Sequence, residues 1–205
     1  MTPKKPTLLL LLLLLALVAL DQATKWYVVL HFNFPQPGYM YDSVPVLAGN
    51  GVLDFNIIRI HNTGVAFGLG NGTQWAPFVF LGVQVAALIA LVWLYARGFF
   101  ATRLLKFAWV FICAGVLGNM ADRLLQGFFI PGAETLDFFT KLRMGYVVDF
   151  LDVSFPWLTL SQYPQGYHWP AFNVADSCIC IAAGLFVISA FFFPEPRQKD
   201  DTPTA

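Results

Sequence analysis

Four long apolar segments divide this 205-residue chain, and they constrain its fold more than any other feature. We place them at about 7–30, 75–95, 104–120 and 174–193. Crossing a bilayer as an α-helix takes about 20 apolar residues, and in lipid only helices and closed barrels satisfy all their own backbone hydrogen bonds. The segments therefore predict four transmembrane helices.

The composition supports an integral membrane protein. Hydrophobic residues make up 58% of the chain and charged residues 12%, with a mean hydropathy of +0.63, whereas soluble domains carry roughly 25% charged residues. The formal net charge is zero, so the basic stripe of a nucleic-acid-binding protein is missing and we expect no nucleic-acid partner. With no internal repeat in view, we predict one membrane domain over 1–205, ending in a disordered tail at 195–205.

The first segment also fits a cleaved signal peptide, because Lys4 and Lys5 precede a leucine run. A retained helix is the preferred interpretation for two reasons. The cleavage-site pattern is poor, since Leu17 stands where a small side chain is wanted. The leucine run alone is also too short to span a bilayer, so the helix must continue to Leu30.

Basic residues predict the orientation of the spans. They stand before the first segment, between the second and third, and after the fourth: Lys4, Lys5, Arg97, Arg103, Lys106, Arg197 and Lys199. The positive-inside rule places such residues in the cytoplasm. Both termini are then cytoplasmic, and the long connections at 30–74 and 121–172 lie outside.

We expect local structure in both external connections. Segments 52–60 and 145–155 are rich in β-branched and aromatic residues with partial alternation, which is typical of strands. In 133–144, apolar side chains recur every three residues from Leu136 to Leu142, which favours a short amphipathic helix on the membrane surface. The predicted fold class is an all-α membrane protein, a four-transmembrane-helix bundle with a small extracytoplasmic β-rich cradle.

Two aspartates lie where apolar neighbours make an ionised group expensive. Asp149 follows an apolar run, and Asp176 stands at the start of the fourth segment, both at the predicted outer face. Two carboxyls that share a proton are the apparatus of aspartic hydrolysis, so this pair is our candidate catalytic site. The structural alternatives are a surface position for Asp149 and a helix cap for Asp176.

Other polar residues gather toward the same face. Asp21 and Lys25 are four apart on one helix, which suits an ion pair, although both could instead reach the membrane interface. Asn62 and Gly64 have the spacing of an ordinary turn. Asn173 shares a helical face with Asp176, and its amide could orient that carboxyl.

The end of the third segment combines small and polar residues. Asn119, Asp122 and Arg123 fall on one helical face, although the two charged residues could simply mark the membrane interface. Ala114 and Gly118 are four apart, so one face carries small residues that let a neighbouring helix approach closely.

We expect neither a metal nor a cofactor. The three histidines are scattered without the spacing of metal ligands on a helix. The three cysteines lie within apolar segments and outside any Cys-x-x-Cys motif, so we expect them to pack as small hydrophobic residues.

In this order the polar motifs resemble those of the lipoprotein signal peptidase (signal peptidase II) family. They are Asp21-Gln22-Ala23-Thr24-Lys25, Asn62-x-Gly64-x-Ala66-Phe67, Gly118-Asn119-x-x-Asp122-Arg123, Val147-Val148-Asp149-Phe150 and Phe172-Asn173-x-Ala175-Asp176. The resemblance covers nearly the whole chain. It implies a bacterial inner-membrane aspartic endopeptidase with four spans and an active site at the outer face.

The resemblance also implies residue roles. Asp149 and Asp176 would be catalytic, and the remaining residues would shape the site and bind the substrate: Asp21, Lys25, Asn62, Gly64, Asn119, Asp122, Arg123 and Asn173. The implied substrate is a diacylglyceryl-modified prolipoprotein, cut immediately before its lipidated cysteine, and membrane lipid is the other partner. We expect a monomer.

The chain departs from the family pattern at several places. Ala114 stands where the family usually has a glycine, and the segments 33–50, 124–146 and 154–169 are longer than usual. All motif residues stay in place. Without the resemblance, two other functions would remain possible, a proton-coupled transporter and a non-catalytic assembly factor. A transporter fits poorly, because both carboxyls lie at one face and the sequence shows no internal repeat.

Overall fold

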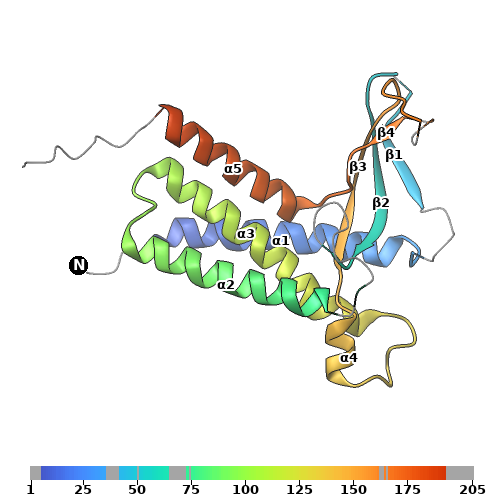
Figure 1. Ribbon diagram of the computed structural model, residues 1–205, viewed down its shortest axis with the longest axis horizontal. Helices are drawn as coiled ribbons and strands as arrows, with labels where there is room; N and C mark the ends of the chain where they lie inside the picture. The colour runs from blue at the N-terminus through green and yellow to red at the C-terminus, as the bar shows by residue number, and fades with distance from the viewer. Residues whose placement is uncertain are drawn as a thin grey trace, which may run out of the picture.

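A computed structural model describes residues 6–35, 42–49, 51–64, 73, 75–161, 164 and 166–192. Helices form a bundle in these ranges, and a small sheet stands at one end of it (Figure 1). Some predictions concern residues outside the described ranges: the tail at 195–205, the basic residues near both termini, and the motif residues Ala66 and Phe67.

Four helices in the described ranges are long and apolar enough to cross a membrane: α1 (Leu8–His31), α2 (Ala76–Arg97), α3 (Arg103–Leu125) and α5 (Val174–Phe192). They lie at the four predicted segments. The third prediction ended at Met120, but α3 runs on to Leu125 and then into a 3-10 turn, Gln126–Phe129. The helix continues because Asp122 and Arg123 are buried against neighbouring elements, so their charges do not end it.

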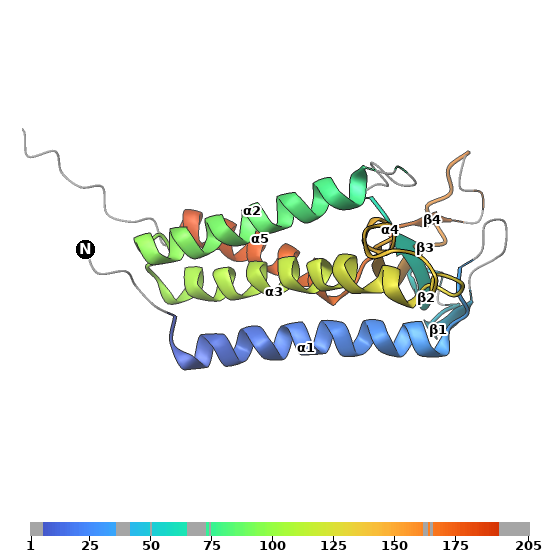
Figure 2. The ribbon, with the colours of Figure 1, turned by 90° about the horizontal axis from the view of Figure 1, so that it is seen from below.

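The third helix is the centre of the bundle. It contacts α1, α2 and α5, and Figure 2 shows it between α1 and α2. Gly118 permits the close approach of α1, because a Cβ at this position would lie 2.5 Å from Oδ2 of Asp21 and 3.1 Å from the Cβ of Ala175. A small residue is therefore required where three helices meet.

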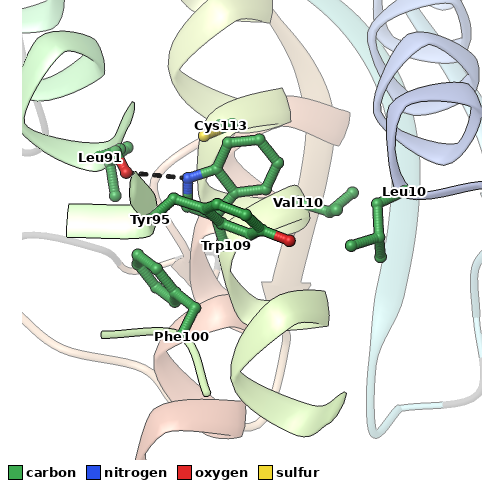
Figure 3. Packing of buried hydrophobic residues seen from close by; sticks show 7 residues of the cluster. All are labelled: Leu10, Leu91, Tyr95, Phe100, Trp109, Val110 and Cys113. Carbon is green, nitrogen blue, oxygen red and sulfur yellow. Dashed lines mark hydrogen bonds between the residues drawn. The ribbon is translucent and has the colours of Figure 1, made fainter. Parts of the chain in front are cut away.

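The end of the bundle away from the sheet has an apolar core. Its members come from α1, α2, α3 and the connection between α2 and α3: Leu10, Leu91, Tyr95, Phe100, Trp109, Val110 and Cys113 (Figure 3). The indole Nε1 of Trp109 donates to the carbonyl oxygen of Leu91 at 3.0 Å. At the start of α3, Thr102 Oγ1 accepts from the backbone N–H of Leu105 at 3.1 Å, which caps the helix.

The sheet is antiparallel, in the order β1 (Ser43–Leu47), β2 (Asp54–Asn62), β3 (Val147–Phe155) and β4 (Tyr167–His168). The all-α prediction is therefore too narrow, because the protein is mostly helical but includes a four-stranded sheet. The predicted strands at 52–60 and 145–155 correspond to β2 and β3. The edge strands were not predicted, since β1 is exposed throughout and contains Pro45, and β4 has two residues.

Two contacts attach the sheet to the end of α1. Val28 packs in a second apolar cluster with Tyr146, Val148 and Phe150. Arg59 on β2 donates from Nη1 to the carbonyl oxygens at the end of α1, those of Val29 at 2.8 Å and Phe32 at 2.9 Å. These bonds satisfy carbonyls that a helix end leaves without a partner in the helix, and they fix β2 relative to α1.

The predicted surface helix at 133–144 is shorter than expected. It forms α4 (Phe138–Arg143), which begins after Asp137, whose Oδ1 accepts from the N–H groups of Phe139 and Thr140 at 3.0 and 3.1 Å. The preceding residues form turns around Gly132, which has a φ of 83°.

Candidate functional site

The candidate catalytic pair lies where α3 and α5 meet the sheet. Asp149 is on β3, opposite Ile60 of β2, and is 3% exposed. Asp176 is in the first turn of α5. The surface alternative for Asp149 is therefore wrong, because its side chain is buried.

Asn173 connects the two aspartates. Its Nδ2 donates to Oδ1 of Asp149 at 2.7 Å. Its backbone N–H donates to Oδ2 of Asp176 at 3.2 Å, and its Oδ1 accepts from the backbone N–H of Asp176 at 2.9 Å. The reciprocal bonds form a capping box at the start of α5. The helix-cap alternative for Asp176 is thus correct for one carboxyl oxygen, Oδ2, which accepts from the backbone N–H of Asn173.

Two further asparagines hold the remaining carboxyl oxygens. Asn119 of α3 donates from Nδ2 to Oδ1 of Asp176 at 2.8 Å. Asn62 of β2 donates from Nδ2 to Oδ2 of Asp149 at 2.9 Å. The turn alternative for Asn62 is also correct, since its Oδ1 accepts from the N–H of Gly64 at 3.0 Å. One asparagine can therefore make a turn and orient a carboxyl at once.

A buried cluster of charged side chains, the ion cluster, contacts one of the asparagines that orient the two aspartates. Nζ of Lys25 lies 3.0 Å from Oδ2 of both Asp21 and Asp122, and it donates to Oδ1 of Asn119 at 2.9 Å. The side chains of Lys25, Asp21 and Asp122 are 0–1% exposed. The interface alternatives for these residues are wrong, because the charges point into the bundle and neutralise one another there.

The two acids of this cluster also bind the segments that carry the catalytic candidates. Asp122 Oδ2 accepts from the backbone N–H of Val148, the residue before Asp149, at 2.9 Å. Asp21 Oδ1 accepts from the backbone N–H of Ala175, the residue before Asp176, at 2.8 Å. The ion cluster therefore fixes the backbone at both sites.

Sequence reasoning missed Gln22. Its Nε2 donates to Oδ1 of Asp122 and to the carbonyl oxygen of Gly118, both at 3.0 Å, and to Oδ2 of Asp21 at 3.2 Å. The sequence did contain a signal for Gln22, because a polar residue inside an apolar span is itself a candidate for a buried contact.

Arg123 binds the turn that follows β2. Its guanidinium donates to the carbonyl oxygens of Gly64 and Thr63, the latter at 3.5 Å, and its Cζ lies 5.2 Å from the centre of the Phe80 ring. Hydrogen bonds and ion pairs thus connect all ten predicted site residues.

Burial and charge favour a proton on the pair. Burial and, after it, the charge of the nearby Asp176 carboxylate raise the pKa of Asp149 from 3.8 to about 7, while Asn62, Lys25 and Asn173 act in the opposite direction. By contrast, burial and the Arg59 charge lower the pKa of His61 to about 3. This histidine is neutral at ordinary pH, and its Nε2 accepts from Nε of Arg59 at 3.0 Å.

The arrangement suits acid–base chemistry on a polar bond. It provides two carboxyls, each oriented by amide donors, and one of them keeps a proton to near neutral pH. Within the described ranges, no three side chains from His, Cys, Asp or Glu gather as they do around a metal ion.

Comparison with known proteins shows similarity over most of the chain. The family model described as Signal peptidase (SPase) II matches residues 13–192. A lipoprotein signal peptidase from Desulforapulum autotrophicum is 36% identical over 88% of this chain and 90% of its own length. One from Pasteurella multocida is 32% identical over 98% of this chain and 100% of its own length.

Solved structures agree with these relatives. A bacterial membrane enzyme determined by the in meso method at 2.3 Å resolution has a TM-score of 0.64 and 25% identity, with 98% of each chain covered. A second one, at 1.9 Å resolution, has a TM-score of 0.60 and 26% identity. The similarity spans all four long helices and the sheet.

Proposed function

The chain belongs to the signal peptidase II family, and from that premise we propose that Asp149 and Asp176 are its catalytic pair. The protein is an aspartic peptidase that removes the signal peptide from prolipoproteins. The observation that carries the residue assignment is the bridge through Asn173, which binds the Asp149 carboxyl at 2.7 Å and caps Asp176 at 2.9 and 3.2 Å.

The two carboxyls divide the chemistry between them. We assign the starting proton to Asp149, whose pKa is raised to about 7, and the role of base to Asp176. Asp176 takes a proton from a water molecule, and the water oxygen attacks the scissile carbonyl carbon. Asp149 donates its proton to the developing oxyanion. When the intermediate collapses, the C–N bond breaks, one hydroxyl of the intermediate returns its proton to Asp149, and the proton held by Asp176 passes to the leaving amine.

The other site residues act by holding this geometry. Asn62, Asn119 and Asn173 orient the carboxyls, while Lys25, Asp21 and Asp122 fix the backbone beside them. Arg123 and Gly64 lie at the turn after β2, where they contact the backbone of the bound substrate. The site needs no metal or cofactor for these steps.

The substrate and the setting follow from the same premise. The substrate carries a diacylglyceryl cysteine and is cut immediately before it, with its acyl chains remaining in lipid. The enzyme is a monomer of one domain in the bacterial inner membrane, with cytoplasmic termini. Arg97, Arg103 and Lys106 support this orientation, because they lie at the end of the bundle opposite the site.

Family membership decides against the transporter and the assembly factor, since both lack a hydrolytic reaction.

Separate Asp149→Asn and Asp176→Asn variants test the catalytic assignment. We expect each to lower the rate of cleavage of lipidated precursor by about 10²–10⁴-fold, because each removes one acid–base group. The matched control is Asp152→Asn on the same strand, a buried aspartate that binds Asn56 at 3.0 Å and His168 at 2.9 Å instead of the site. Near-normal cleavage by either folded variant, or an equal loss in the control, would contradict the assignment.

A further inference from the structure

Between α3 and β3 lies a group of exposed aromatic residues that the proposed chemistry does not use. Phe129 of the 3-10 turn is 57% exposed, and Phe138 and Phe139 of α4 are 60% and 71% exposed. We call these three residues the aromatic platform. Large apolar side chains this exposed mark a binding surface when they lie together.

The platform is firmly attached to the catalytic end of the bundle. A Cβ at Gly127 would overlap the carbonyl oxygen of Lys141, and one at Gly145 would overlap that of Arg123. The backbone of α4 and its flanks therefore packs directly on the end of α3. Since Arg123 belongs to the site and Gly145 precedes β3, the platform packs directly against the elements that carry the site.

Ring contacts show which elements lie next to the platform. Phe138 lies 5.4 Å from the ring of Phe128, and Phe129 lies 4.8 Å from the ring of Trp26 on α1. Phe128 and Phe129 end the stretch Arg103–Phe129, which is apolar and long enough to span a membrane. The platform therefore lies at the sheet-side end of a stretch that is long and apolar enough to span a membrane.

The ends of the spans nearest the platform also expose apolar side chains. Tyr27 and Leu30 in the last turns of α1 are 60% and 73% exposed, and α4 contacts both α2 and α3. Figure 1 shows α4 beside the sheet-side ends of these helices, whereas β1 is an edge strand of the sheet, separated from β3 by β2.

We propose that the aromatic platform is an interfacial anchor that inserts into the leaflet on the site side and is covered by phospholipid. Aromatic rings favour the headgroup region, and a short helix with an apolar face lies in the plane of the interface. Because the platform is fixed to Arg123 and β3, it sets the height of the catalytic pair relative to the bilayer.

Spin labels at two exposed apolar positions test the anchor. The control position is Val46 on β1, whose side chain is 60% exposed. A nitroxide is attached to the full-length protein at Phe139→Cys or, as the control, at Val46→Cys. Each is reconstituted in phosphatidylcholine–phosphatidylglycerol nanodiscs that hold one copy and no substrate. The label's collision rates with oxygen, which concentrates in lipid, and with a water-soluble nickel chelate are then measured. The unsubstituted protein, labelled alike, supplies the background from the native cysteines.

We expect the oxygen-to-nickel ratio to be several-fold higher at position 139 than at position 46. Equal ratios at the two positions would overturn the proposal. So would a ratio at 139 that rises only after lipidated precursor is added, because the platform would then bind substrate, or only in discs that hold two copies, because it would then be a dimer contact. A double variant controls for a folding defect at α4. Phe138→Cys combined with Phe139→Leu should give the same oxygen-to-nickel ratio as Phe138→Cys alone.

Discussion

The two ends of the bundle bury opposite kinds of side chain. At the end away from the sheet, Tyr95, Phe100 and Trp109 pack among aliphatic residues. At the sheet end, Lys25 and Asp122 are buried as deeply, and they are stabilised by charges and amides. Burial of ionised groups costs free energy that their mutual attraction offsets only in good geometry. The apolar end therefore contributes stability, and the polar end contributes function.

The charge balance at the polar end explains why the pair keeps a proton. Lys25 and Arg123 supply two positive charges, and Asp21 and Asp122 supply two negative ones. Ionisation of one member of the catalytic pair makes three negative charges, and ionisation of both makes four. The second ionisation adds a negative charge to a buried site that already has an excess, so it is strongly disfavoured.

Lys25→Met should have the largest effect on stability. It leaves Asp21 and Asp122 buried without their cation, so we expect the free energy of unfolding to fall by about 3–5 kcal/mol. Denaturant unfolding in mixed micelles measures the change. In the double variant Asp21→Asn, Lys25→Met, part of the loss should return, because one buried charge is gone. A loss below about 1 kcal/mol in the single variant, the size of an exposed pair, would contradict the account.

Asn173→Ala should separate chemistry from stability. It removes the bond that orients Asp149, and misplacement of a catalytic group by about 1 Å costs about 10²-fold in rate, so we expect kcat/KM to fall by that factor. The lost helix cap should cost only about 1 kcal/mol of stability. The measurement compares precursor cleavage with unfolding.

Thr102→Ala is the matched control, since it removes the cap of α3 at the other end of the bundle. It should lower stability by a similar amount and leave kcat/KM unchanged. Equal activity losses in the two variants would mean that Asn173 acts only as a cap.

Trp109→Phe should have the smallest effect. It deletes the hydrogen bond to Leu91 but keeps an aromatic ring in the apolar core, so we expect stability to fall by about 1 kcal/mol. The kinetic constants should stay within error of the parent, because the apolar end takes no part in the reaction. A change in kcat without a change in stability would show that the two ends are coupled.

Much of this arrangement could be predicted from local patterns. Apolar length located the four spans, and β-branched and aromatic content located β2 and β3. The spans and strands depend on near neighbours in the sequence, so a single chain reveals them. The residues that meet at the sheet end were predicted differently, from the resemblance of the ordered polar motifs to a known family.

The partners of the buried charges could not be predicted in the same way. Lys25 pairs with Asp122 as well as with its helical neighbour Asp21, and Gln22 binds the same acid, because α1 and α3 cross at Gly118. Such contacts join residues almost one hundred positions apart. The edge strands were missed for another reason, since β1 is exposed and contains Pro45, and its pairing depends on β2 rather than on its own composition.

Infrared titration of the protonated carboxyl group of Asp149 tests the central claim most directly. The difference between the spectra of the parent and Asp149→Asn should contain a protonated-carboxyl band that disappears with a pKa of about 7. In Asp176→Asn the pKa of Asp149 should move downward, because a nearby negative charge is gone, yet stay above 3.8, because burial is the larger cause. A band that titrates near pH 4 in the parent, or does not respond to Asp176→Asn, would contradict a pair of carboxyls that share one proton.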